Sequence, residues 1–120
     1  MRTLGQKRAE FALNKVVDIP QDKKDKFKPF SAGAPSMILQ NGFGQALAFW
    51  IAKSKNEYSE HMTMFNIVKE WLCQNNLTTG QNTTEFIRNI SQLDQSQYLT
   101  AQKETLALLE WVKRYANAGL

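Results

Sequence analysis

The sequence has very little of the chemistry that binds metals or forms disulfides, with one cysteine and one histidine among 120 residues. Cys73 has no second cysteine with which to form an internal disulfide or a zinc site. With His61 as the only imidazole, a metal centre would need three or more carboxylates, and the acidic residues are scattered along the chain. We therefore expect no metal and no organic cofactor, and a protein suited to a reducing compartment.

Long apolar runs are also missing. The first residues contain no apolar segment of the signal-peptide kind. The most apolar stretch, residues 43–52, is about half as long as the roughly twenty residues that a membrane span requires. We expect a cytoplasmic protein without a membrane partner.

Strand-like alternation is absent, and apolar residues recur instead at spacings of three and four, which predicts helices throughout. Hydrophobic residues make up 42% of the chain, enough for a core without covalent cross-links. No polar linker is long enough to divide the chain. We therefore predict an all-α fold, a single compact bundle of five to seven helices around a buried central helix, in one helical domain over residues 1–120.

The central helix is predicted from the segment NGFGQALAFW, residues 41–50. The Asn-Gly pair favours a tight turn because these residues tolerate positive φ angles, and Gly44 would let a neighbouring backbone come close. From Phe43 to Ala52, apolar residues cover the whole circumference of the helix. A helix that is apolar on every side is expected to be buried on every side.

The other predicted elements lie on both sides of this segment; they are helices over 3–18, 23–30, 56–74, from residue 83 and from Tyr98 to Gly119, with a polar loop over 75–82. Gly33 is expected to end the lysine-rich helix, in which two phenylalanines face the core and the lysines face solvent. Pro35 is expected to begin a new turn, where its missing N–H has no consequence. Tyr58 is placed on the apolar arc of its helix.

No arrangement of residues indicates an active site. The segment GFGQAL resembles the start of a dinucleotide-binding motif, but Leu47 occupies the place of the third small residue and no strand pattern precedes it. His61 lies on an apolar arc, where a partly buried core histidine is the usual explanation. No Ser/His/Asp set or phosphate-binding loop occurs. We expect a protein that is not an enzyme and has no small-molecule substrate.

Positive charge is unevenly distributed along the chain. Residues 1–55 contain ten Lys and Arg against four Asp and Glu, whereas residues 56–120 contain five against seven. This asymmetry indicates a basic face with an anionic partner, the alternative being a surface that serves solubility alone. Cations near helix ends can also complement helix dipoles. If the helices pack as a bundle, one stripe could neutralise a phosphate backbone; its candidate residues are Arg8, Lys15, Lys53, Lys113 and Arg114.

Three segments resemble one known family in order and spacing; they are RAEFALNKV at 8–16, PSMILQNGFGQALAFW at 35–50 and TLALLEWVKRYA at 105–116. On these segments the chain resembles the small α-helical subunit of the Cmr complex, the type III-B CRISPR RNA-guided effector. The resemblance implies a protein without catalytic activity that helps hold target RNA in antiviral defence. It implies as partners the other Cmr subunits, stacked copies of the chain itself, and guide and target RNA.

Two other functions are compatible with a basic helical chain. A helical DNA-binding regulator would need an exposed recognition helix with base-reading side chains. The apolar helix after the glycine turn cannot supply one. A protein–protein adaptor would carry its positive charge incidentally.

Overall fold

Six helices and one short 3-10 turn form the chain in a computed structural model that describes residues 1–120. They are α1 (Leu4–Val17), η1 (Gln21–Lys23), α2 (Lys24–Asn41), α3 (Phe43–Lys53), α4 (Glu60–Gln74), α5 (Thr83–Gln92) and α6 (Gln95–Asn117). No strand is present, which confirms the predicted all-α fold. No helix combines the length and apolar character needed to cross a membrane.

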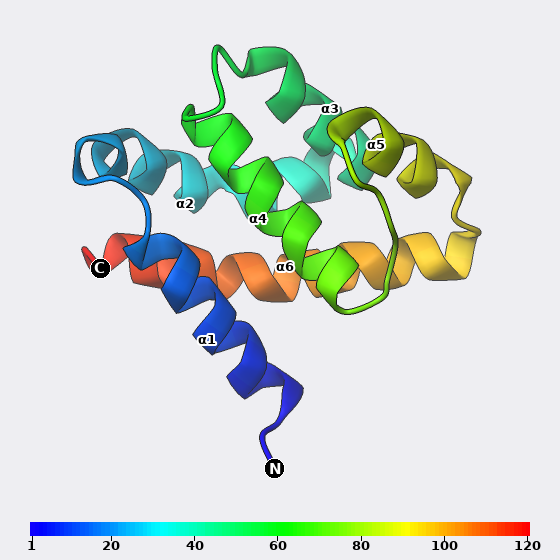
Figure 1. Ribbon diagram of the computed structural model, residues 1–120, viewed down its shortest axis with the longest axis horizontal. Helices are drawn as coiled ribbons and strands as arrows, with labels where there is room; N and C mark the ends of the chain where they lie inside the picture. Colours follow the sequence, from blue (N-terminus) through cyan, green and yellow to red (C-terminus); the bar gives the residue numbers. More distant parts are fainter.

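The longest helix, α6, organises the fold (Figure 1). It has 23 residues, so at about 1.5 Å per residue it spans roughly 34 Å. Helices α1 and α2 both pack on it, and in the view of Figure 1 α4 crosses in front of α2 and α6, while α3 and α5 lie above α6. Between these helices, 23 buried hydrophobic residues form one core cluster.

Four helices begin at side chains that satisfy free backbone N–H groups. In each case the side-chain oxygen accepts from the backbone of the first turn; the capping residues are Thr3, Ser59, Asn82 and Asp94. The first and last of them form full capping boxes with the glutamines three residues on. These local signals explain where α1, α4, α5 and α6 begin.

Helix α2 continues through both of the places where a break was predicted. Gly33 and Pro35 lie inside it, as does Pro29, and the lysine-rich segment and the following turn form one helix of 18 residues. The reason is packing: Phe27, Ala34 and Ile38 form one buried face that is shared by the two segments. Burying that face against α6 outweighs the backbone hydrogen bonds that the prolines remove.

The glycine turn before α3 is confirmed, with Gly42 at a φ of 91°. The role expected of Gly44 is corrected, because a side chain and not a backbone approaches it. The Gly44 N–H donates to the Tyr98 hydroxyl oxygen over 2.7 Å. A Cβ at this position would lie only 3.1 Å from that oxygen. Glycine therefore leaves room for the hydrogen bond that joins the beginning of α6 to the beginning of α3.

The prediction that α3 is buried on every side is wrong. It buries Phe43, Ala46, Leu47 and Trp50, whereas its other side is exposed, including Phe49 at 42%. Helix α3 contacts α2, α4 and α5 on its inner side only and lies at the edge of the molecule (Figure 1). An apolar circumference therefore did not place this helix at the centre.

Helix α4 begins later than expected, at Glu60 and not near residue 56, because Ser59 caps it. Tyr58 consequently lies in the preceding loop and is 58% exposed, not on an apolar arc as predicted. The predicted loop over 75–82 is confirmed between α4 and α5. It includes two positive φ angles, at Asn76 and Gly80.

Candidate nucleic-acid interface

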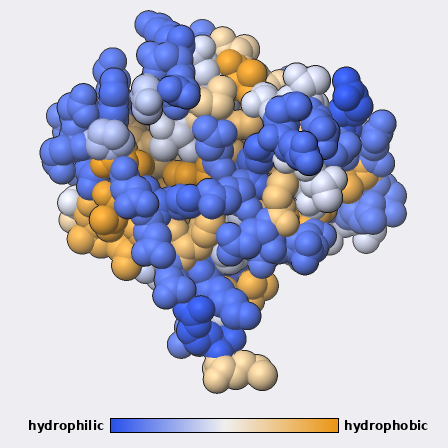
Figure 2. Space-filling model, viewed as in Figure 1, coloured by the Kyte–Doolittle hydropathy of each residue, from blue (hydrophilic) through white to orange (hydrophobic).

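A pocket of about 320 Å³ lies where the beginning of α2 meets the loop between α3 and α4. We call it the cationic pocket; its lining residues are Lys23, Lys26, Lys53, Lys55, Asn56, Tyr58, Ser59, Glu60 and His61. In Figure 2 the part of the surface formed by the beginning of α2 and the α3–α4 loop, at the upper left, is covered by hydrophilic side chains. Four lysines from segments distant in sequence thus surround one cavity.

The fold brings these lysines together from two separate stretches of the chain. Lys23 ends η1 and Lys26 lies in the first turn of α2, while Lys53 is the last residue of α3 and Lys55 follows it in the loop. None of the four has a carboxylate within ion-pair distance. The beginning of α4 adds the partial positive charge of a helix N-terminus.

Aromatic side chains lie against two of the residues that line the cationic pocket. The His61 ring lies 4.6 Å from the Phe30 ring and 6.3 Å from the Phe49 ring, measured between centroids. The Nζ of Lys53 lies 5.6 Å from the centroid of Phe49. The expected partly buried setting of His61 is confirmed, and its aromatic neighbours are Phe30 and Phe49.

Glu60 is the one carboxylate in the lining of the cationic pocket. Its Oε1 lies 3.5 Å from Nδ1 of His61, at the outer limit of a hydrogen bond. Four lysines against one carboxylate leave the pocket positively charged. Such a cavity favours an anion of the size of a phosphate group.

Of the five predicted cations, only Lys53 lines the cationic pocket. Arg8 on α1 instead pairs with Glu104 on α6 through both Nε and Nη2, the latter at 2.9 Å from Oε1. The indole N–H of Trp71 donates to the same carboxylate over 3.0 Å. The Arg8 and Glu104 side chains are only 20% and 11% exposed, so this pair links α1, α4 and α6.

The Arg8–Glu104 pair changes the acidity of both groups. Burial alone would raise the pKa of Glu104, but hydrogen bonds from Arg8 and Trp71 and the guanidinium charge outweigh it and lower that pKa. The hydrogen bond to Glu104 raises the pKa of Arg8 in turn. Both groups are therefore ionised in the folded protein at neutral pH.

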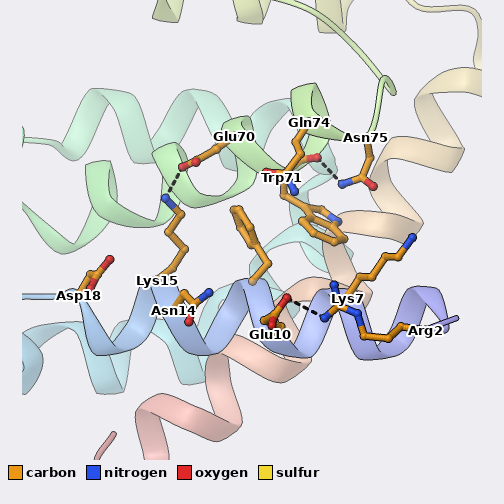
Figure 3. A pocket seen from close by; sticks show the side chains of 11 residues that line it. Arg2, Lys7, Glu10, Asn14, Lys15, Asp18, Glu70, Trp71, Gln74 and Asn75 are labelled. Atoms are coloured by element: carbon orange, nitrogen blue, oxygen red, sulfur yellow. Dashed lines mark hydrogen bonds and ion pairs between the residues drawn. The ribbon is translucent and has the colours of Figure 1, made fainter.

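Lys15 also has a partner. Its Nζ lies 2.5 Å from Oε2 of Glu70 and 5.4 Å from the centroid of Phe11. It lines a second pocket of about 380 Å³ between α1 and α4, which we call the α1–α4 groove (Figure 3). Figure 3 shows Lys15 reaching across to Glu70, and Arg2 turned back to Glu10. The groove carries three cations and three carboxylates; they are Arg2, Lys7, Lys15, Glu10, Asp18 and Glu70.

Lys113 and Arg114 lie near the end of α6, and neither has an ion-pair partner. Lys113 is half-buried and Arg114 is exposed. They belong to neither of the two pockets. The structure therefore divides the five predicted cations among four places and does not gather them in one cavity.

Sequence reasoning missed Lys23, Lys26 and Lys55 as candidates. Lys23 and Lys26 lie in the run KKDKFK, which has the pattern of a solvated helix face. Both side chains are indeed exposed, whereas Phe27 between the lysines of this run is buried. Only their approach to the loop after α3 makes them part of a site. The one signal that could have found them is the dense clustering of Lys within residues 23–28.

Reactive groups elsewhere are sparse. No group of three or more His, Cys, Asp or Glu residues is placed to hold a metal ion. Cys73 is half-buried, and burial raises the pKa of its thiol more than the nearby Lys69 lowers it. The thiol is therefore protonated at neutral pH, as expected of an unreactive cysteine.

The fold and the cationic pocket together define a small all-helical protein with four unpaired lysines around one cavity. The sequence profile of the family described as CRISPR-associated protein (Cas_Cmr5) matches residues 4–119. The chain belongs to this Cmr5 family, the small subunits of the type III-B CRISPR Cmr complex. This finding confirms the resemblance in the three sequence segments.

Two curated relatives carry the description CRISPR system Cmr subunit Cmr5. The one from Thermotoga maritima is 31% identical over 114 residues, covering 95% of this chain and 82% of the relative. The one from Thermus thermophilus is 30% identical over 119 residues, covering 98% and 96%. A crystal structure of a Cmr5 family protein from Thermus thermophilus superposes with a TM-score of 0.79 at 26% identity, covering 98% of this chain and 97% of that one.

Proposed function

We propose that this chain is a non-catalytic subunit that helps hold the target RNA strand in the Cmr complex, in the cytoplasm. The observation that carries the proposal is the set of four unpaired lysines around the cationic pocket. Lysine contacts with phosphates position a strand without reading its sequence. Sequence specificity would then come from pairing with the guide RNA.

The other predicted cations enter this proposal unequally. Lys113 and Arg114 have no carboxylate partner and are available to a phosphate. Arg8 and Lys15 would first have to leave Glu104 and Glu70. We therefore rank Lys53 and its neighbours in the pocket first, and Arg8 last.

Copies of the chain are proposed to stack along the complex, each adding one cationic pocket to the path of the RNA. The exposed side of α3 supports a protein contact of this kind, because it presents Ala48, Phe49 and Ala52 to solvent. Exposed apolar surface on a helix is typical of a docking face. The other Cmr subunits are alternative partners for the same face.

A histidine beside a carboxylate in a basic pocket is the one arrangement here that could suggest RNA cleavage. His61 and Glu60 have this arrangement, at 3.5 Å between Nδ1 and Oε1. The chain has no second histidine to act as the partner acid or base. We propose that His61 has a structural role on Phe30, and that the purified protein leaves RNA intact.

The test is target-RNA binding by the reconstituted complex at several salt concentrations. One variant combines Lys23→Gln with Lys26→Gln. A matched control combines Arg88→Gln with Lys103→Gln, two exposed cations outside the pocket. Losing two phosphate contacts to a single strand should flatten the slope of log K against log salt by about 1.4, equally for target RNAs of unrelated sequence.

An unchanged slope in the pocket variant, or an equal change in the control, would contradict this function. Retention of the wild-type affinity together with normal assembly of the complex would instead favour a protein–protein adaptor with incidental charge. A loss confined to one target sequence would show that the pocket reads bases.

A further inference from the structure

Tyr58 is the most exposed aromatic side chain in the protein, at 58%, and it lines the cationic pocket beside the four lysines. A large exposed ring in a short loop has no packing role in the monomer. The pocket therefore combines unpaired cations with one free aromatic face. The proposed function as an RNA-holding subunit uses the cations and leaves the ring unexplained.

The loop holds the Tyr58 backbone in a defined turn. The side chain of Asn56 accepts from the Tyr58 N–H over 2.8 Å, and the Asn56 carbonyl accepts from the Ser59 N–H over 3.2 Å. The Ser59 hydroxyl in turn caps α4 by accepting from the Met62 N–H. Because these contacts order the loop, the backbone of Tyr58 is held at the pocket before any ligand binds.

One carboxylate lines the cationic pocket and a second lies next to Tyr58. Glu57 lies by the Tyr58 hydroxyl, where a hydrogen bond and its negative charge raise the pKa of that tyrosine. Glu60 lies by His61. Four lysines exceed these two acids, so the net charge facing a phosphate stays positive.

We propose that the cationic pocket is a nucleotide subsite for single-stranded RNA, in which the lysines hold a phosphate and the ring of Tyr58 stacks on a base. This inference rests on the proposed function and adds base stacking to it. Proteins that bind single strands without sequence preference combine a cationic groove with aromatic stacking platforms in this way. The volume of about 320 Å³ is at the lower end of the range for sites that bind small organic molecules.

The test uses NMR titration of the isotopically labelled full chain with two probes of equal length, an oligouridylate and an abasic ribose-phosphate oligomer. We expect the oligouridylate to shift the amide signals of Lys55–His61 and to bind about five- to a hundredfold more tightly than the abasic probe, the range for stacking on one aromatic residue. Tyr58→Ala should abolish this difference, and Tyr58→Phe should retain it. Lys26→Gln should weaken both probes alike.

The outcomes separate the stacking inference from the function on which it rests. Equal binding of the two probes by the wild type, or an unchanged preference in Tyr58→Ala, overturns stacking while the lysine contacts stand. If Tyr58→Ala changes the binding of the probes but Lys26→Gln does not, the combined phosphate and base site is overturned. Absence of any shift with either probe overturns the subsite, and the salt dependence of the reconstituted complex then decides the proposed function independently.

Discussion

The α1–α4 groove and the cationic pocket are similar in size, about 380 and 320 Å³, and each is lined by several cations. They differ in whether those cations have partners. In the groove, Lys15 pairs with Glu70 and Arg2 with Glu10 (Figure 3), whereas no lysine of the pocket has an ion-pair partner. The availability of a charge is therefore set by its tertiary neighbours, and the number of cations in a region does not reveal it.

The contrast between paired and unpaired cations is sharpest at the Arg8–Glu104 pair, which Trp71 connects to the groove. Arg8 was a candidate for phosphate contact, but the structure gives it a bidentate carboxylate with little exposure to solvent. A cation that is paired and mostly buried in this way holds two helices together. Paired cations should accordingly affect stability, and unpaired cations should affect binding.

The largest expected effect is the loss of stability in Glu104→Ala. The substitution leaves Arg8 and the Trp71 N–H without their shared acceptor in a mostly buried position. We expect the free energy of unfolding to fall by about 2–3 kcal/mol, with Tm lower by roughly 10 °C, in thermal and urea denaturation. Glu110→Ala, at an exposed position of the same helix, is the matched control and should change little. A loss below about 0.5 kcal/mol would show that paired cations do not hold this fold together.

A second effect of similar origin depends on pH. Because the pKa of Glu104 is lower in the folded than in the unfolded protein, its ionised form stabilises the fold at neutral pH. This contribution is fully present above the pKa of the unfolded chain and is lost as the pH falls through the folded-state pKa. The stability difference between wild type and Glu104→Gln should therefore be largest near pH 7 and shrink progressively below about pH 4. A difference that stays constant down to about pH 2 would rule out this origin.

The smallest expected effect comes from making the groove resemble the pocket. Glu70→Gln removes the partner of Lys15 and leaves the groove with an excess of positive charge. The pair is partly exposed, so stability should change by less than about 1 kcal/mol. If the freed Lys15 gains one phosphate contact, the salt dependence of RNA binding by the reconstituted complex should steepen by about 0.7. An unchanged slope would show that the groove lies away from the RNA path.

Much of the helical architecture was predictable, because its signals are local. Period-three and period-four spacing identified the helices, and the Asn-Gly pair identified the turn at Gly42. The errors arose where tertiary packing overrode a local preference. Pro35 did not break α2, since its neighbours on one face are buried against α6.

The candidate site was less predictable. Of the five cations chosen from the sequence, Lys53 alone lines the cationic pocket, because helical periodicity gives the direction of a side chain on its own helix and not the residues it meets. The same limitation applies to α3, whose apolar circumference could not reveal that only one of its sides would be covered. Exposed Tyr58 was placed on an apolar arc, but the helix begins only after the Ser59 cap, so Tyr58 lies outside it.

The sequence by itself determined that the chain is all-helical, that it belongs to the Cmr5 family, and that its positive charge is concentrated in residues 1–55. These properties depend on residue types and on spacings within a few turns of helix. The tertiary structure alone decided which cations are neutralised and which remain free. An ion pair between Arg8 and Glu104 joins residues 96 positions apart, and only the packing of α1 on α6 brings their charges within reach of each other.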